Sequence, residues 1–258
     1  LSTFERFAEI LGRRLGEMHV ALSQTTDDEA FAPVPADSAQ VERWTKRVDG
    51  RIQAACDNLK RHRELLGEAE QALADGVLQR RAALSTLVRR LCEAGKGSLL
   101  HRIHGDFHLG QTLVASGDVM IIDFEGEPSQ PLAERRAKDS GWRDVAGILR
   151  SFDYALAAAR RSPAAASNDG AYATLATAFK ERMPQTLLQA YSKATGAQGH
   201  WRSQDGAGHT ALLDLFMLEK AAYEINYEVS NRPDWLGVPL RGLTDLMDRL
   251  LSGDAADD

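Results

Sequence analysis

Apolar positions recur along most of the chain with helical spacing, which predicts a mainly α-helical protein. The segment Ser2-Thr3-Phe4-Glu5 has the pattern of a capping box and predicts that a helix begins there. Gly12 and Gly16 lie one turn apart on this helix and predict close packing against another helix. The apolar stripe that follows the cap contains Phe4, Phe7, Leu11, Leu15, Met18 and Leu22.

A loop over residues 24–37 follows, because Pro33 and Pro35 forbid regular helix. The next helix is long and amphipathic, with a break near Gly67 or Gly76 and a further helix ended by Gly95 and Gly97. Its inward-facing residues are Val41, Trp44, Val48, Ile52, Ala55 and Leu59. Later helices are predicted near 141–161, 170–195, 207–230 and 240–251.

One short region breaks the helical pattern and predicts a β-hairpin. Two β-prone runs, 112–115 and 119–122, flank a three-residue connection with Gly117 at its centre. This closure sets Thr112 opposite Ile122, so Gln111 and Asp123 lie side by side at the open end. Their Cα atoms are then roughly 5 Å apart.

Three polar side chains converge at that open end, because Asp106 lies in the loop that leads into the first strand. Mg²⁺ prefers oxygen ligands and often takes one or two from protein. Gln111 and Asp123 fit that need, which leaves Asp106 to accept the proton of an attacking hydroxyl or to orient it. This order of parts predicts phosphoryl transfer.

The amino-acid sequence around these residues resembles the catalytic centre of the aminoglycoside-phosphotransferase-like kinases. Within that group it resembles the maltokinases most closely. Those enzymes make maltose 1-phosphate from maltose, with ATP as co-substrate and Mg²⁺. The resemblance implies the C-terminal lobe of a protein-kinase-like fold, mainly α with a small β-hairpin. The matching segments are His104-Gly-Asp-Phe-His-Leu-Gly-Gln111, Ile121-Ile-Asp-Phe-Glu-Gly-Glu-Pro128, 131–136, 143–154, 219–228 and 231–235.

The family's N-terminal lobe, which carries a lysine and a loop over the nucleotide, has no counterpart upstream of the catalytic loop. The one GxGxxG-like stretch, over 206–211, follows a polar loop rather than a strand. We therefore expect residues 1–251 to be a kinase C-terminal lobe and 252–258 a flexible tail. The catalytic hairpin region is 101–128 and the sugar-binding region 207–251. The N-lobe is expected on a longer parent chain, as in fusions to trehalose synthase, which would leave this fragment inactive alone.

Four further residues near the predicted site each have two interpretations. His104 is expected to pin the catalytic loop rather than transfer a proton. His108 could approach a substrate hydroxyl or make a structural hydrogen bond. Glu125 could interact with the residues that bind the metal, without binding it directly, or it could be an exposed charge at a turn. Asp144 is expected to brace the catalytic loop or cap a helix.

A sugar site is predicted on the last long helix. Lys220, Tyr223, Glu224 and Tyr227 are spaced three and four residues apart and share one helix face. Carboxylates and amines bind sugar hydroxyls, and aromatic rings pack on sugar C–H faces. A polar surface stripe explains the spacing equally well. The resemblance favours a maltose site, with Trp235 as a neighbour.

Composition agrees with a globular protein that works on small molecules. The chain has 258 residues and a formal net charge of −6, so nothing indicates nucleic acid or an anionic membrane as partner. No apolar run approaches the roughly 20 residues of a membrane span. Cys56 and Cys92 are expected to be buried free thiols, as in a protein of the reducing cytoplasm.

Three alternatives to a maltokinase remain open from the sequence. A different small-molecule kinase of the same group would share the catalytic motif of Asp106, Gln111 and Asp123. A metallophosphoesterase would use Gly105-Asp-Phe-His108 and recruit His101 and His104, but it needs an earlier Asp-x-His and a later Gly-Asn-His that the sequence lacks. A non-catalytic interaction module is disfavoured because the predicted site residues are intact.

Overall fold

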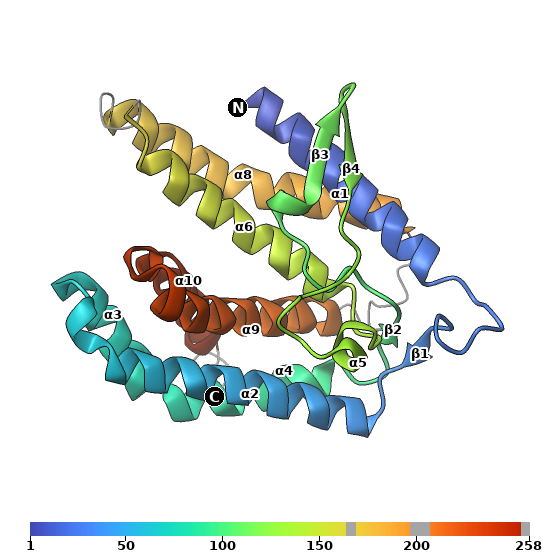
Figure 1. Ribbon diagram of the computed structural model, residues 1–258, viewed down its shortest axis with the longest axis horizontal. Coiled ribbons are helices and arrows are strands. Elements are labelled where there is room, and N and C mark those ends of the chain that lie inside the picture. Colours follow the sequence, from blue (N-terminus) through green and yellow to red (C-terminus); the bar gives the residue numbers. More distant parts are fainter. Residues whose placement is uncertain (164–168, 197–206, 254–258) are drawn as a thin grey trace. The chain divides into compact units, whose positions relative to one another are not determined.

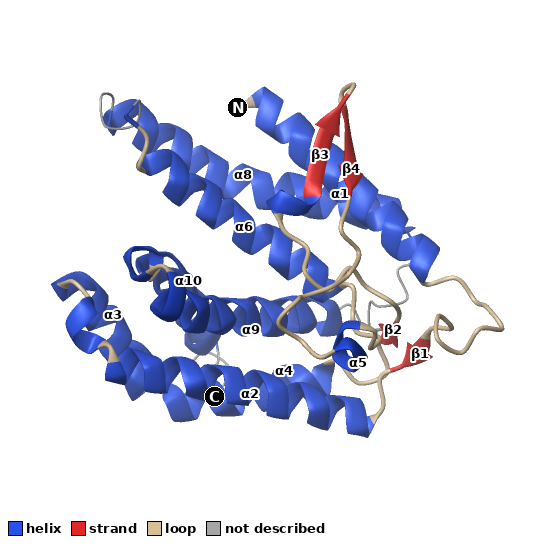
Figure 2. Cartoon of the chain, viewed as in Figure 1, coloured by secondary structure: helices blue, strands red, loops and turns tan. Residues whose placement is uncertain are grey.

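The computed structural model describes residues 1–163, 169–196 and 207–253 and is mainly helical, as predicted (Figures 1 and 2). Contacts divide the chain into two compact units. The first unit is Leu1–Pro35 with Ser98–Arg202, and the second is Ala36–Gly97 with Ser203–Asp258. Most of the predicted tail, 254–258, lies outside the described residues. No helix in the described ranges is long and apolar enough to cross a membrane.

The first unit is built on helix α1 packed along helix α8 (Figure 1). The two glycines of α1 make this approach close, as predicted. A Cβ on Gly12 would lie 2.3 Å from the Leu187 carbonyl oxygen, and one on Gly16 would lie 2.7 Å from the Ala194 Cβ. The helices of this unit are α1 (Ser2–Leu22), α5 (Leu132–Arg135), α6 (Trp142–Arg160) and α8 (Asp169–Thr195), with the 3-10 turn η2 (Leu109–Gln111).

Helix α1 begins where the sequence predicts, but the predicted capping box does not form. Ser2 is already inside the helix, Leu1 holds the cap position, and no side chain caps the end. Glu5, the other half of the box, instead pairs with Arg182 of α8. The tertiary ion pair thus replaces the local hydrogen bond. Phe4, at the start of the stripe, remains half exposed and touches the Phe179 ring edge-on.

The second unit packs helix α9 against α2, α4 and α10. All six predicted inward residues of α2 are buried, and Asp37 caps α2 by accepting from the Gln40 N–H at 2.7 Å. The helices are α2 (Ser38–Arg61), α3 (Glu68–Gln79), α4 (Arg81–Ala94), α9 (Ala207–Asn231) and α10 (Gly237–Gly253), with turns η1 (Arg63–Leu65) and η4 (Pro233–Trp235).

Cys56 and Cys92 are both free and buried in this unit, as predicted. Burial raises the pKa of each thiol, and it raises that of Cys92 to about 11. Neither thiol is therefore a ready nucleophile.

Within the described residues the strands form two separate antiparallel pairs, both in the first unit. β1 (Val34–Pro35) pairs with β2 (Leu99–Leu100), and β3 (Thr112–Ala115) pairs with β4 (Asp118–Ile121). The β3–β4 hairpin is the predicted one (Figure 2).

The predicted register of this hairpin is wrong by one residue. Thr112 pairs with Ile121 rather than Ile122. The loop has two residues instead of three, because Ser116 and Gly117 both take positive φ, 52° and 75°, as a type I′ turn requires. The sequence did not predict this turn, because residue 116 is a serine and positive φ is uncommon for serine.

Helix α1 holds the turn end of the hairpin through charge. Arg14 makes two hydrogen bonds to the Asp118 carboxylate, that from Nε being 3.0 Å. The pKa of Asp118 falls to about 2 because Arg14 and the Val119 N–H donate to its carboxylate. Both side chains are more than one-third exposed, so this pair orients the hairpin more than it stabilises the fold.

The close α1–α8 packing predicts opposite effects for two Gly-to-Ala changes. Gly12→Ala should lower the free energy of unfolding by about 1 to 3 kcal/mol, because the added methyl meets backbone that cannot rotate away. Gly50→Ala is the control: nothing lies within 4 Å of its Cβ position in α2, so better helix propensity should add about 0.5 to 1 kcal/mol. Urea unfolding followed by circular dichroism measures both. Equal effects would contradict this account of the interface.

Candidate active site

Asp144, in the first turn of α6, holds the loop before the hairpin through hydrogen bonds. Its buried carboxylate accepts from the His104 N–H at 2.8 Å and from the Gly105 N–H at 2.9 Å. Burial alone would raise the pKa of Asp144, but the hydrogen bond from His19, the nearby imidazoles of His19 and His104, and the Gly105 N–H together lower it. Gly105 takes φ +84°, which a glycine accepts without strain. Asp144 thus fixes the backbone just before Asp106.

The imidazole of His104 connects this loop to the end of strand β4. Its Nε2 lies 2.8 Å from the Ile122 carbonyl oxygen, and its ring contacts Phe107 and Phe124 at centroid distances of 5.2 and 5.1 Å. Asp123 follows with φ +65°, which is uncommon for a residue other than glycine. The His104 contact therefore holds the residue next to a strained backbone position.

The structure brings Gln111 and Asp123 together despite the changed register. The Ile122 N–H donates to the Gln111 carbonyl oxygen at 3.0 Å and extends the ladder by one bond. Gln111 Nε2 lies 3.1 Å from Asp123 Oδ2. Asp123 is exposed and Gln111 half-buried, so oxygen atoms of both can reach a ligand. An amide oxygen beside a carboxylate is a donor set that suits Mg²⁺.

Asp106 and His108 lie close together in the loop before the hairpin. His108 Nδ1 accepts from the Gly110 N–H at 3.0 Å, which leaves the proton of a neutral ring on Nε2. That Nε2 lies 4.0 Å from Asp106 Oδ2. The Asp106 side chain is largely buried, with 15% of its surface exposed. His108 thus has a structural hydrogen bond and also faces the candidate base.

Helix α6 approaches the loop before the hairpin closely at Gly147. A Cβ on Gly147 would lie 2.4 Å from the Phe107 carbonyl oxygen, so any larger residue would push the loop away. Glu125 is exposed, and its carbonyl oxygen accepts from Arg135 Nη1 at 3.3 Å.

The predicted sugar face lies on α9, in the second unit. Lys220 and the two tyrosines do share one face: Lys220 Nζ is 5.0 Å from the Tyr223 ring centroid, and the Tyr223 and Tyr227 rings stack at 6.4 Å. Tyr227 is 43% exposed. Glu224 is buried, with 7% exposure, and lies toward the inner side of the helix.

Sequence reasoning missed the arginines around these rings. Arg51 of α2 lies 5.3 Å from the Tyr223 centroid and also contacts the buried Glu219 carboxylate at 3.0 Å. Arg232 lies 5.5 Å from both the Tyr227 and Trp235 centroids. Arg51 is far away in sequence, so no local pattern could have assigned it. Arg232 stands within the matched segment 231–235, which could have drawn attention to it.

The histidines needed by a metallophosphoesterase do not gather at one point. His101 Nδ1 is 2.7 Å from the Arg102 carbonyl oxygen, and His104 is engaged with Ile122. Burial and the neighbouring His19 lower the pKa of His101 to about 4. Among the described residues, no cluster of three or more His, Cys, Asp or Glu side chains could hold a metal ion. The two-metal interpretation is therefore not favoured.

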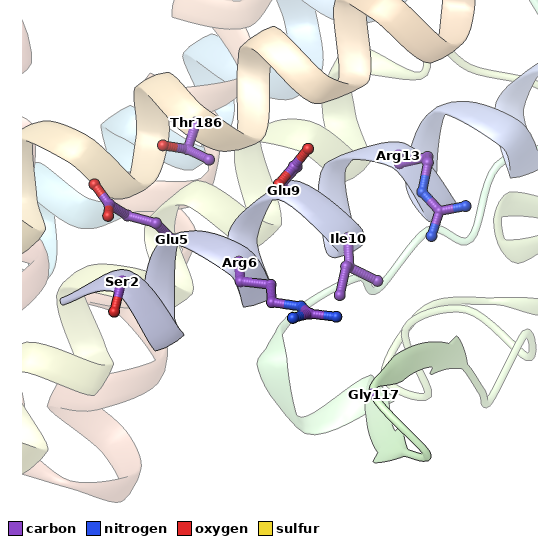
Figure 3. Close-up of a pocket in the computed structure, with 8 residues that line it drawn as sticks. All are labelled: Ser2, Glu5, Arg6, Glu9, Ile10, Arg13, Gly117 and Thr186. Atoms are coloured by element: carbon purple, nitrogen blue, oxygen red, sulfur yellow. The ribbon is translucent and has the colours of Figure 1, made fainter.

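A surface pocket of about 590 Å³ lies in the first unit, between α1, α8 and the hairpin turn (Figure 3). Its lining is ionic, with Glu9 and Arg13 from α1, and it reaches the hairpin at Gly117. Gly117 is in the turn, whereas Gln111 and Asp123 are at the open end, so this pocket is separate from the candidate catalytic groups.

Comparisons with known proteins show similarity to glucosamine kinases. No protein-family model matches the chain. The chain is 29% identical over 238 residues to a glucosamine kinase of Streptacidiphilus jiangxiensis, covering 92% of this chain and 48% of that protein. It is 31% identical over 147 residues to a glucosamine kinase of Mycolicibacterium smegmatis (strain ATCC 700084 / mc(2)155), covering 56% and 34%.

Solved structures give the same result. A glucosamine kinase crystal structure matches with a TM-score of 0.76 and 26% identity, over 96% of this chain and 55% of that one. A glucosamine kinase in complex with glucosamine, ADP and inorganic phosphate matches equally well, over 96% and 56%. The chain thus spans about half the length or less of these relatives. The class of protein it resembles is a sugar kinase; these names do not support maltokinase specifically.

The charge on Asp144 predicts a pH-dependent contribution to stability. Its folded-state pKa lies below the usual value, so its hydrogen bonds should stabilise the fold fully above about pH 4 and be lost as pH falls through the lowered pKa. Asp144→Asn should cost about 3 kcal/mol at pH 7. Urea unfolding of both proteins from pH 7 to pH 3 should show the difference shrinking toward acid. A constant difference would contradict an ionised Asp144.

Proposed function

We propose that this chain is the catalytic and sugar-binding part of an ATP-dependent kinase that phosphorylates a sugar hydroxyl. The observation that carries the proposal is the contact between Gln111 and Asp123 next to the braced loop of Asp106. The similarity to glucosamine kinases, over nearly the whole of this chain, supports the same reaction class.

In the proposed reaction, Asp106 orients the acceptor hydroxyl and takes its proton as the oxygen attacks the γ-phosphorus of ATP. ADP leaves as the bond between the β–γ bridging oxygen and phosphorus breaks. The largely buried position of Asp106 and the loop fixed by Asp144 suit this role, because a base must stay aligned with the hydroxyl. His108 Nε2, on the same side, can donate to Asp106 or to the acceptor.

Gln111 and Asp123 would hold Mg²⁺, which when bound would neutralise charge on the phosphate oxygens. The apolar face of the hairpin supports a nucleotide here. Leu113 of β3 pairs with Met120 of β4, so the two side chains lie on the same face of the hairpin. Both side chains are about half exposed, so they can pack against an aromatic base.

We propose glucosamine as the acceptor, because relatives that match over nearly the whole of this chain are named glucosamine kinases. Maltose, which the sequence motifs favour, is the competing acceptor. The α9 face supports either sugar through the exposed Tyr227 ring and the Lys220 amine. Glu224 would be a weaker contributor, since its carboxylate is buried.

The complete protein is proposed to include a lobe that covers the nucleotide. The match to only about half of each solved glucosamine kinase supports this. The comparisons give no support to a fused trehalose synthase. Activity is therefore best measured on the complete protein, and binding on this chain.

Asp106→Asn in the complete protein should lower kcat at least about 100-fold, because the amide cannot accept the hydroxyl proton. A coupled assay for ADP with ATP, Mg²⁺ and either glucosamine or maltose measures this. Asp27→Asn is the control, a loop carboxylate outside the site that should leave kcat unchanged. Near-normal turnover by the Asp106 variant would remove it from the mechanism.

Tyr227→Ala should weaken sugar binding to this chain about tenfold, because the exposed ring would no longer pack on the sugar. Calorimetric titration with glucosamine and with maltose identifies the acceptor and tests the face together. Tyr172→Ala is a matched control: its ring also contacts an arginine, Arg160, but lies on α8. Unchanged affinity in the Tyr227 variant would show that this face of α9 is an ordinary helix surface and not a sugar site.

A further inference from the structure

We propose that His19 is a positioning residue for the catalytic loop, acting through Asp144 and held in turn by Tyr191. Nothing in the sequence pattern singles out His19, which lies 85 positions before His104 and on a helix with no catalytic group. Its effect on the loop follows from the structure alone, and only the kinetic consequence rests on the proposed function.

The three side chains come from three helices and meet in the interior of the first unit. His19 and Tyr191 have no exposed surface, and Asp144 has 1%. His19 Nε2 is 3.1 Å from Asp144 Oδ2, and His19 Nδ1 is 2.9 Å from the Tyr191 hydroxyl. Helix α8 is thereby connected through α1 to α6, and from α6 to the loop.

The direction of the hydrogen bonds follows from the charge on Asp144. An ionised carboxylate only accepts, so His19 Nε2 must carry the proton between the two residues. Asp144 Oδ2 then accepts from both His19 and the His104 N–H, while Oδ1 accepts from the Gly105 N–H. His19 therefore fixes the rotation of the carboxylate that holds two successive loop amides.

The imidazole has little freedom to give up this orientation. Its ring contacts His101 and Tyr191 at centroid distances of 5.2 and 5.7 Å. Gly141 closes the remaining side, since a Cβ there would lie 2.8 Å from His19 Nδ1. A simple space-filling role would need the ring but not its nitrogen atoms, and this difference can be tested.

The direct test is hydrogen exchange of the His104 and Gly105 amides in this chain, measured by NMR. His19→Leu fills similar space without a donor and should speed exchange of both amides about tenfold or more beyond the change in global stability. His19→Gln keeps a donor toward Asp144 and should restore most of the protection. Tyr191→Phe, which removes only the hydroxyl, should give a smaller increase.

Leu15→Val is the control. Leu15 is buried one turn before His19 on α1, and it takes no part in the hydrogen bonds that connect His19 to Asp144. The substitution lowers stability but should leave the two amides protected relative to the rest of the unit. If His19→Leu speeds these amides no more than Leu15→Val does at matched stability, the positioning role is overturned. Failure of Gln to restore protection would overturn it as well.

The kinetic readout on the complete protein separates this proposal from the proposed function. A positioning role predicts that His19→Leu lowers kcat about tenfold with little change in KM for ATP, and that His19→Gln recovers it. A loss confined to KM would overturn the role. If the protein phosphorylates no sugar, the exchange result still decides whether His19 positions the loop.

Discussion

The candidate site depends on one buried charge. Asp144 stays ionised in the interior because donors surround it, and two of those donors are the backbone amides of the catalytic loop. A carboxylate placed there without them would be strongly unfavourable, so the loop conformation and the charge require each other. The close packing of α6 against the loop at Gly147 also fixes the position of the loop. Helices that carry no reacting group thereby determine where Asp106 lies.

The helices could be predicted from the sequence because each buries a periodic apolar face, and α2 shows this most clearly. The hairpin was also predictable, but its register depended on Ser116 adopting positive φ, which residue preference disfavours. The capping box failed for a different reason, because Glu5 pairs with Arg182 of α8 instead of with the local backbone. One prediction thus failed on a local backbone conformation and the other on a contact distant in sequence.

The same distinction applies to the candidate site. Asp106, Gln111 and Asp123 lie within twenty residues, so their motif could be read directly. His19 and Arg51 could not, because they reach their partners across 125 and 168 or more positions of sequence. The comparisons complete the picture by supporting a sugar kinase and shifting the proposed acceptor from maltose to glucosamine. In the proposed function the acceptor would contact side chains of α9, where residue spacing alone does not distinguish a sugar site from an ordinary polar surface.

The left-handed backbone at Asp123 has a consequence for how this chain can change. A non-glycine residue in that conformation costs about 1 kcal/mol, which glycine would not incur. Replacement by glycine would therefore relax the fold while deleting a carboxylate that the proposed chemistry needs. Glycine at this position would raise stability but remove a group that the proposed activity needs. Selection for thermal resistance alone would therefore favour the loss of Asp123.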